Sequence, residues 1–229
     1  MKRTIPLLSL ASLAAFASLG LSLVACSDSP DVEATITPLA CGRLTCDLDR
    51  PLGVGSKLAF EPAPLGLVAS VRVSNPAIAT VAPGFLQAAE GYTVTAVAAG
   101  RVTVELLDDD GEIIGSRELE VAAADHLEAT ITVIGPTGTA QLDRVTAEQP
   151  QSVPATSTVR ISVDQRRGAD PLLGWSEYEV EPTLTNGARV VRWDREGNAT
   201  LEIRAGGDQA VRFRSTSTAL DSRFVLAAR

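Results

Sequence analysis

The stretch Val71-Arg-Val-Ser-Asn-Pro-Ala-Ile-Ala-Thr-Val81, followed by Tyr92-Thr-Val-Thr-Ala-Val-Ala-Ala-Gly-Arg-Val-Thr-Val104, decides the fold of this 229-residue chain. Apolar and polar residues alternate along it, and such alternation places one face of a strand on a core and the other in water. Asn75-Pro76 predicts a turn, because proline fixes φ and biases the preceding residue toward extended geometry. Gly100 supplies a tight reversal before the next strand.

The same alternation continues through the rest of the chain, at residues 159–164, 201–204 and 211–214. Turn residues recur about every 8–12 residues, and long stretches with helical spacing are absent, a pattern typical of all-β proteins. Residues 135–157 are rich in Pro, Thr and Gln, which favours either a bent edge strand or a mobile insertion. The sequence predicts two tandem antiparallel β-sandwich domains, at residues 34–122 and 126–229, joined by a short linker.

The opening stretch resembles the bacterial Ig-like domain family. The shared pattern is a Ser-Asn-Pro turn, an Ala-Thr-Val strand, and a Val-Thr-Ala-hydrophobic-Ala-x-Gly turn into a threonine-rich strand. The resemblance covers about residues 34–122 and implies an Ig-like fold there. It departs from the family between Phe85 and Gly91, where an unusual hairpin or bulge is expected. The second domain carries no clear family pattern.

The N-terminus has the parts of an export signal. Lys2 and Arg3 precede an apolar run at residues 5–25, and the end of this run with the next residue reads Leu23-Val24-Ala25-Cys26. This ending resembles the lipobox of bacterial lipoproteins. The resemblance implies that a signal helix at residues 1–25 is removed, that Cys26 takes up acyl chains such as palmitate, and that residues 26–33 form a tether. Ordinary secretion and an uncleaved membrane anchor are the alternatives.

The resemblance also implies an address in the bacterial cell envelope. By the family's sorting rule, the residue after the lipid cysteine, Ser27, directs a lipoprotein of enteric bacteria to the outer membrane; the leaflet stays open. With Cys26 committed to lipid, Cys41 and Cys46 are left as a pair, which outside the cytoplasm predicts a disulfide. A zinc site is the rival interpretation, but two thiols without a nearby histidine do not fill four positions.

The net charge of −8 argues against a nucleic-acid partner, which requires a basic face. The acids are concentrated in the first half: residues 26–125 hold 15 acidic and 6 basic residues, and residues 126–229 hold 13 and 12. Two interpretations fit the arginines of the second half. They either form one positive stripe suited to an anionic glycan or protein, or make cross-strand ion pairs with Glu202 or Asp194; the four are Arg192, Arg204, Arg212 and Arg214.

Neither of two catalytic or metal-binding patterns is complete. Residues 108–113 (Asp-Asp-Asp-Gly-Glu-Ile) are similar to a calcium loop, but Leu106 and Arg117 would occupy its first and last ligand positions. Gly174-Trp-Ser-Glu-Tyr178 misses the last glycine of a nucleophile elbow, and the only histidine of the chain, His126, lies in the expected linker. We therefore expect no enzymatic activity, no cofactor and no metal.

The aromatic residues of the second half leave one question open. Trp175, Tyr178, Trp193 and Phe213 pack in the core or form a partly exposed binding platform. The favoured function is that of a membrane-anchored, non-enzymatic envelope lipoprotein that serves as a binding, adhesion or spacer module for an unknown envelope protein or glycan. The alternative is a module that binds a glycan or peptidoglycan through Trp175 and Trp193.

Overall fold

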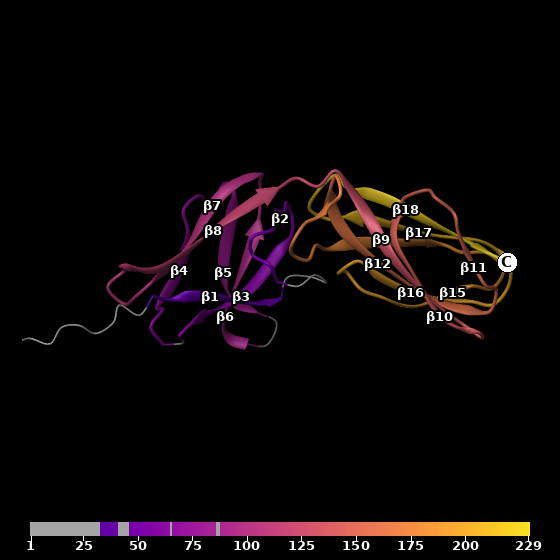
Figure 1. Ribbon diagram of the computed structural model, residues 1–229, viewed down its shortest axis with the longest axis horizontal. Coiled ribbons are helices and arrows are strands. Elements are labelled where there is room, and N and C mark those ends of the chain that lie inside the picture. The colour runs from indigo at the N-terminus through magenta and orange to yellow at the C-terminus, as the bar shows by residue number, and fades with distance from the viewer. Residues whose placement is uncertain (1–32, 41–45, 65, 86–87) are drawn as a thin grey trace, which may run out of the picture. The chain divides into compact units, whose positions relative to one another are not determined.

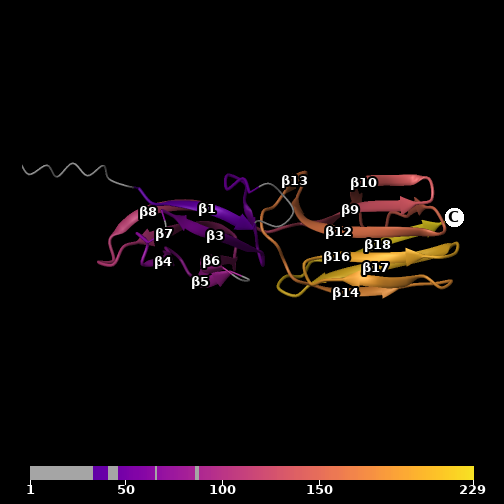
Figure 2. The same ribbon diagram turned by 90° about the horizontal axis from the view of Figure 1, so that it is seen from below.

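The computed structural model describes residues 33–40, 46–64, 66–85 and 88–229. The expected signal helix, most of the tether, Cys26 and Cys41 lie outside these ranges. The described part contains strands and turns and no helix, which confirms the all-β expectation. Figures 1 and 2 show the strands in two groups, and residues 33–229 form one compact unit.

The first sandwich consists of strands β1 to β8, in two four-stranded sheets. One sheet has the order β1 (Thr35–Ala40), β3 (Lys57–Ala63), β6 (Ala88–Ala96) and β5 (Ala79–Phe85). The other has the order β2 (Leu52–Gly53), β8 (Ile113–Ala122), β7 (Gly100–Leu107) and β4 (Ser70–Val73). All pairs are antiparallel except β2 with β8. The alternating positions of β7 face inward, since Val102, Val104 and Leu106 are buried.

The second sandwich consists of strands β9 to β18. Its larger sheet has the order β10 (Gly138–Thr146), β9 (His126–Gly135), β12 (Ser157–Arg167), β16 (Asn198–Ile203) and β15 (Arg189–Trp193), with β13 (Asp170–Pro171) paired to β12. The smaller sheet has the order β11 (Gln151–Val153), β18 (Asp221–Ala228), β17 (Gly207–Ser215) and β14 (Tyr178–Thr183).

Aromatic rings fill the centre of the second core. Phe213 lies edge-on to Tyr178 at 6.4 Å between ring centroids and to Phe224 at 5.9 Å. Such edge-to-face pairs contribute about 0.5–1.5 kcal/mol beyond the area they bury. Two members of the aromatic set, Tyr178 and Phe213, therefore belong to the core.

Two irregular segments match expectations from the sequence. The pairing of β5 with β6 shifts register between Pro83 and Phe85, and Gly84 has a φ of 96°. This confirms the bulge expected where the chain departs from the Ig-like pattern. Strand β10 is an edge strand whose register shifts between Leu142 and Val145, which confirms a bent edge strand in the 135–157 segment.

Gly115 marks the closest backbone approach in the first sandwich. The amide of Ala34 donates a 2.8 Å hydrogen bond to the carbonyl of Ile114, so the start of the described chain crosses strand β8 here. A Cβ atom at position 115 would collide with the carbonyl oxygen of Ala34.

We predict that Gly115→Ala lowers the free energy of unfolding by roughly 1–3 kcal/mol, because backbone must move to admit the methyl group. The matched control is Gly135→Ala, where the nearest atom to an added Cβ is Pro154 Cγ at 3.7 Å. Urea unfolding of both variants tests this, and equal stability of the two would contradict the packing described for β8.

Candidate functional site

Several predicted site residues stay predictions. Cys26, the lipid attachment residue, and Cys41, one half of the expected disulfide, lie outside the described residues. Cys46 is described and exposed. In the described part of the chain, no helix has the length and apolar character to cross a membrane, and no three His, Cys, Asp or Glu side chains gather as metal ligands would.

The segment that precedes β14 makes strand-like backbone hydrogen bonds with the first sandwich. The amide of Leu173 donates to the carbonyl of Pro51 at 2.8 Å, and the amide of Gly53 donates to the carbonyl of Leu173 at 3.0 Å. Lys57 and Trp175 exchange both of their backbone bonds, at 2.8 and 3.0 Å. We call this region, residues 173–175 with their partners at residues 51–57, the joint.

Leu173 belongs to the core of the first sandwich, although its neighbours in sequence belong to the second. It is only 2% exposed and packs in the same cluster as Leu52, Leu58 and Phe60. Gly174, with a φ of 93°, follows it. A Cβ atom there would lie 2.6 Å from Leu52 Cδ1 and 2.8 Å from the Lys57 carbonyl oxygen, so only glycine fits the turn after Leu173.

A buried polar cluster lies beside the joint. The hydroxyls of Ser56 and Ser176 are 2.7 Å apart, and Gln165 Nε2 donates to Ser176 Oγ at 2.7 Å. All three residues are buried. Burial raises the pKa of Tyr178 to about 12, although its interactions with Ser176 and Gln165 lower it. These hydrogen bonds pair hydroxyls that the contact between the sandwiches buries, where an unpaired polar group would cost about 1–3 kcal/mol.

An open notch of about 340 Å³ adjoins the joint. Trp175 and the ion pair of Lys57 with Glu177, 2.7 Å between Nζ and Oε1, are among the groups that line it. The hydrogen bond from Lys57 and then its charge hold the pKa of Glu177 below its usual value against the opposing effect of burial, and the charge of Arg195 adds a smaller lowering.

Trp175 and Trp193 lie in different surroundings. Trp175 is half-buried and its backbone is bonded to Lys57, whereas the side chain of Trp193 is 54% exposed on the edge strand β15. Trp193 is not among the residues that line the notch. The two tryptophans proposed as one binding platform therefore do not share this pocket.

The catalytic patterns remain incomplete within the described residues. Ser176, the serine of the incomplete elbow, is bonded to Ser56 and Gln165 and not to a histidine. His126 Nδ1 is hydrogen-bonded to Asp125, whose pKa is lowered by the amide of Gly168 and then by His126. The oxygen Oδ1 of Asp108 accepts bonds from the amides of Asp110 and Glu112, which makes this segment a hairpin turn.

The expectation of one arginine stripe is wrong. Arg192 and Arg204 belong to the larger sheet of the second sandwich, where Arg192 is on β15 and Arg204 follows β16, whereas Arg212 and Arg214 are on β17 of the smaller sheet. Alternation along a strand reports which way a side chain faces, but not which sheet contains the strand. The alternative holds only in part: Arg204 pairs with Glu202, but two residues along the same segment, and the cross-strand partner of Glu202 is Arg189.

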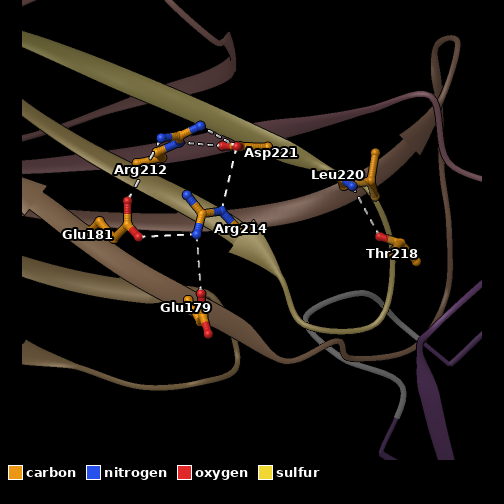
Figure 3. A network of polar contacts seen from close by, with 7 residues as sticks. All are labelled: Glu179, Glu181, Arg212, Arg214, Thr218, Leu220 and Asp221. Atoms are coloured by element: carbon orange, nitrogen blue, oxygen red, sulfur yellow. Dashed lines mark hydrogen bonds and ion pairs between the residues drawn. The ribbon is translucent and has the colours of Figure 1, made fainter.

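Figure 3 shows how the arginines of β17 are neutralised on the outer face of the smaller sheet. Arg212 donates to both carboxylate oxygens of Asp221, which holds the pKa of Asp221 below its usual value. Arg214 lies between Glu179, Glu181 and Asp221, at 3.6, 3.4 and 3.8 Å. This face is a cross-strand ladder of paired charges.

No protein-family model and no curated protein matches the chain. Solved structures that are similar include domains 5–6 of the S-layer protein SbsC, at 13% identity over 84% of this chain and 99% of that one, with a TM-score of 0.34. The Bacteroides ovatus mixed-linkage glucan protein SGBP-B is 12% identical over 81% of this chain and 45% of its own, with a TM-score of 0.34. The D00–D0 domain of intimin is 11% identical over 85% and 100%, with a TM-score of 0.26. Similarities of this extent carry no ligand or activity to this chain.

We predict that Glu177→Gln destabilises the protein near neutral pH by roughly 0.5 kcal/mol, a small effect because solvent screens this half-exposed ion pair. The folded-state pKa of Glu177 is lowered, so its contribution is present above the unfolded pKa and is lost as the pH falls through the folded value. The difference from the unsubstituted protein should therefore vanish at low pH.

Urea unfolding at neutral and acidic pH measures this difference. Glu61→Gln is the control, since Glu61 has no ion pair among the described residues. A Glu177→Gln effect of the same size at both pH values would contradict the electrostatic origin.

Proposed function

We propose that this chain is a non-enzymatic envelope lipoprotein, anchored through acylated Cys26, whose two sandwiches act as a stiff spacer and binding module. The joint is the observation that carries the proposal. Independently moving domains need a linker with few contacts across it. Here Leu173 completes the core of the first sandwich from a segment of the second, and four backbone hydrogen bonds accompany it.

The chain between the sandwiches is also held on both sides. Strand β8 ends at Ala122 and β9 begins at His126, so three residues connect them. The carbonyl of Ala122 accepts a 2.9 Å bond from Val54, and the amide of Asp125 donates a 2.8 Å bond to Arg166. Such a connection, together with the joint, supports a stiff arm better than a flexible tether of two domains.

The anchoring part of the proposal rests on the lipobox resemblance and has its own test. Mass spectrometry of the protein from its native envelope should find residues 1–25 removed, acyl chains on Cys26 and a disulfide between Cys41 and Cys46. An unmodified N-terminus would contradict the anchor and leave the argument from the joint untouched.

A glycan-binding module is the second candidate, because the side chain of Trp193 is 54% exposed on an edge strand. The face of an exposed aromatic ring can stack on the apolar face of a sugar. On a glycan array, this candidate predicts binding that Trp193→Ala abolishes without a change in thermal unfolding.

We predict that Gly174→Ala uncouples the two sandwiches, because the methyl group would collide with Leu52 and the Lys57 carbonyl. The matched control is Gly168→Ala: Gly168 also has a positive φ, of 59°, but an added Cβ there meets nothing within 4 Å. Both substitutions place alanine at a positive φ, which costs roughly 1–2 kcal/mol in backbone strain. Only the methyl group of Gly174→Ala also collides with residues of the joint.

Relaxation of backbone ¹⁵N nuclei measures the coupling. In the unsubstituted protein and in Gly168→Ala, both sandwiches should share one rotational correlation time. In Gly174→Ala they should tumble with separate, shorter times. Separate times in the unsubstituted protein, or equal effects of the two variants, would overturn the proposal of a stiff module.

A further inference from the structure

The outer face of the larger sheet in the second sandwich holds two arginines in one cross-strand row. Arg160 of β12 and Arg192 of β15 are both register partners of Thr200 on β16, the strand between them. Adjacent strands lie about 4.8 Å apart, so the two arginine backbones are roughly 10 Å from each other. Both side chains are exposed, and both border an open groove of about 500 Å³.

Neither guanidinium is neutralised within the described residues. The ion pairs that arginines make at this sheet involve other arginines: Arg166 with Glu128, Arg167 with Glu120, and Arg189 and Arg204 with Glu202. The opposite outer face of the same sandwich provides the contrast. Figure 3 shows Arg212 and Arg214 paired with acids there, and Arg223 of β18 pairs with Glu148. The groove is therefore a place where two neighbouring arginines have no ion-pair partner among the described residues.

Asp194, the acidic residue among those that line the groove, is hydrogen-bonded within a turn. Asp194 Oδ1 accepts bonds from the amides of Glu196 and Asn198 at 3.0 and 3.1 Å. The side-chain amide of Asn198 donates to both carboxylate oxygens at 3.0 Å. These bonds occupy the carboxylate that would otherwise compete for the arginines, and the groove retains two positive charges against one negative charge.

The rest of the groove carries the groups that a sugar requires. Thr200 and Ser162 offer hydroxyl groups. Ser162 Oγ donates to Asn198 Oδ1 at 2.7 Å and can still accept a bond, whereas both donors of the Asn198 amide are used by Asp194. Val191, the residue skipped where β15 shifts register, is 57% exposed at the groove and gives an apolar wall. Hydroxyls and amides bind sugar hydroxyls, an exposed valine contacts the C–H face of a ring, and guanidinium groups bind carboxylates in bidentate geometry.

We propose that this groove binds a carboxylated polysaccharide, with Arg160 and Arg192 contacting carboxylates of the same chain. The charge selects an anionic ligand, and the hydroxyl groups of Thr200, between the arginines, and of Ser162, on the same strand as Arg160, favour a sugar polymer over an acidic peptide. This site is separate from the joint and does not depend on the stiffness of the module.

The test titrates the purified protein with an oligogalacturonate and follows backbone amide shifts. The expected result is binding localised to β12, β15 and β16, with a Kd of roughly 1 mM or lower. Raising NaCl from about 0.05 M to about 0.5 M should weaken it, since salt screens exposed charges. The double variant Arg160→Gln with Arg192→Gln should bind roughly tenfold more weakly.

The matched control is the double variant Arg212→Gln with Arg223→Gln, which removes the same charge from the opposite face and should leave the Kd unchanged. Thermal unfolding checks that both variants are folded. The proposal is overturned by no binding to the unsubstituted protein, by equal weakening in both double variants, or by equal binding of the uncharged methyl ester. It is also overturned if poly-glutamate binds as tightly at the same residues, which would make the groove a site for acidic proteins.

Discussion

Leu173 is buried in the hydrophobic core of the first sandwich, although the strands on either side of it in the sequence, β13 and β14, belong to the second. To bury its side chain there, the chain must run alongside β2 and the start of β3, which places its amide and carbonyl groups within hydrogen-bond reach of that edge. The left-handed turn at Gly174 follows from the same requirement. Separating the sandwiches would expose the side chain of Leu173 and break the backbone hydrogen bonds of the joint at the same time. This one contact therefore restricts how the two sandwiches can move relative to each other.

The two outer faces of the second sandwich use arginine in different ways. On the smaller sheet, each arginine of β17 contacts acids on neighbouring strands, which makes the face self-neutral and unattractive to charged ligands. On the larger sheet, the acids near Arg160 and Arg192 are occupied, Asp194 by a turn and Glu202 by two other arginines. Net charge alone would not reveal this difference, because both faces belong to a half of the chain that is nearly neutral.

The sequence predicted which residues form strands and which side chains face a core. It did not predict which strands share a sheet or how the two sandwiches contact each other. Alternation at residues 159–164 predicted that Val159, Ile161 and Val163 face a core, and all three are buried. Alternation could not assign Arg192 and Arg212 to different sheets, because the period along a strand carries no information about its partners. Nor could it find the joint: residues 173–175 show no periodicity, and their partners at residues 51–57 lie about 120 positions earlier. Gly174 can be read from the sequence as a turn residue, but its close contact with Leu52 and Lys57 is seen only in the structure.

Native-state hydrogen exchange at the joint tests the central claim most directly. The amides of Gly53, Lys57, Leu173 and Trp175 donate the four backbone hydrogen bonds of the joint. If the sandwiches are coupled as described, these amides should be protected to a degree comparable with the paired amides of β12 and β17, since they open only when the core around Leu173 opens. Exchange at rates typical of exposed loops, with the strand amides still protected, would show that the joint opens freely and would contradict the account.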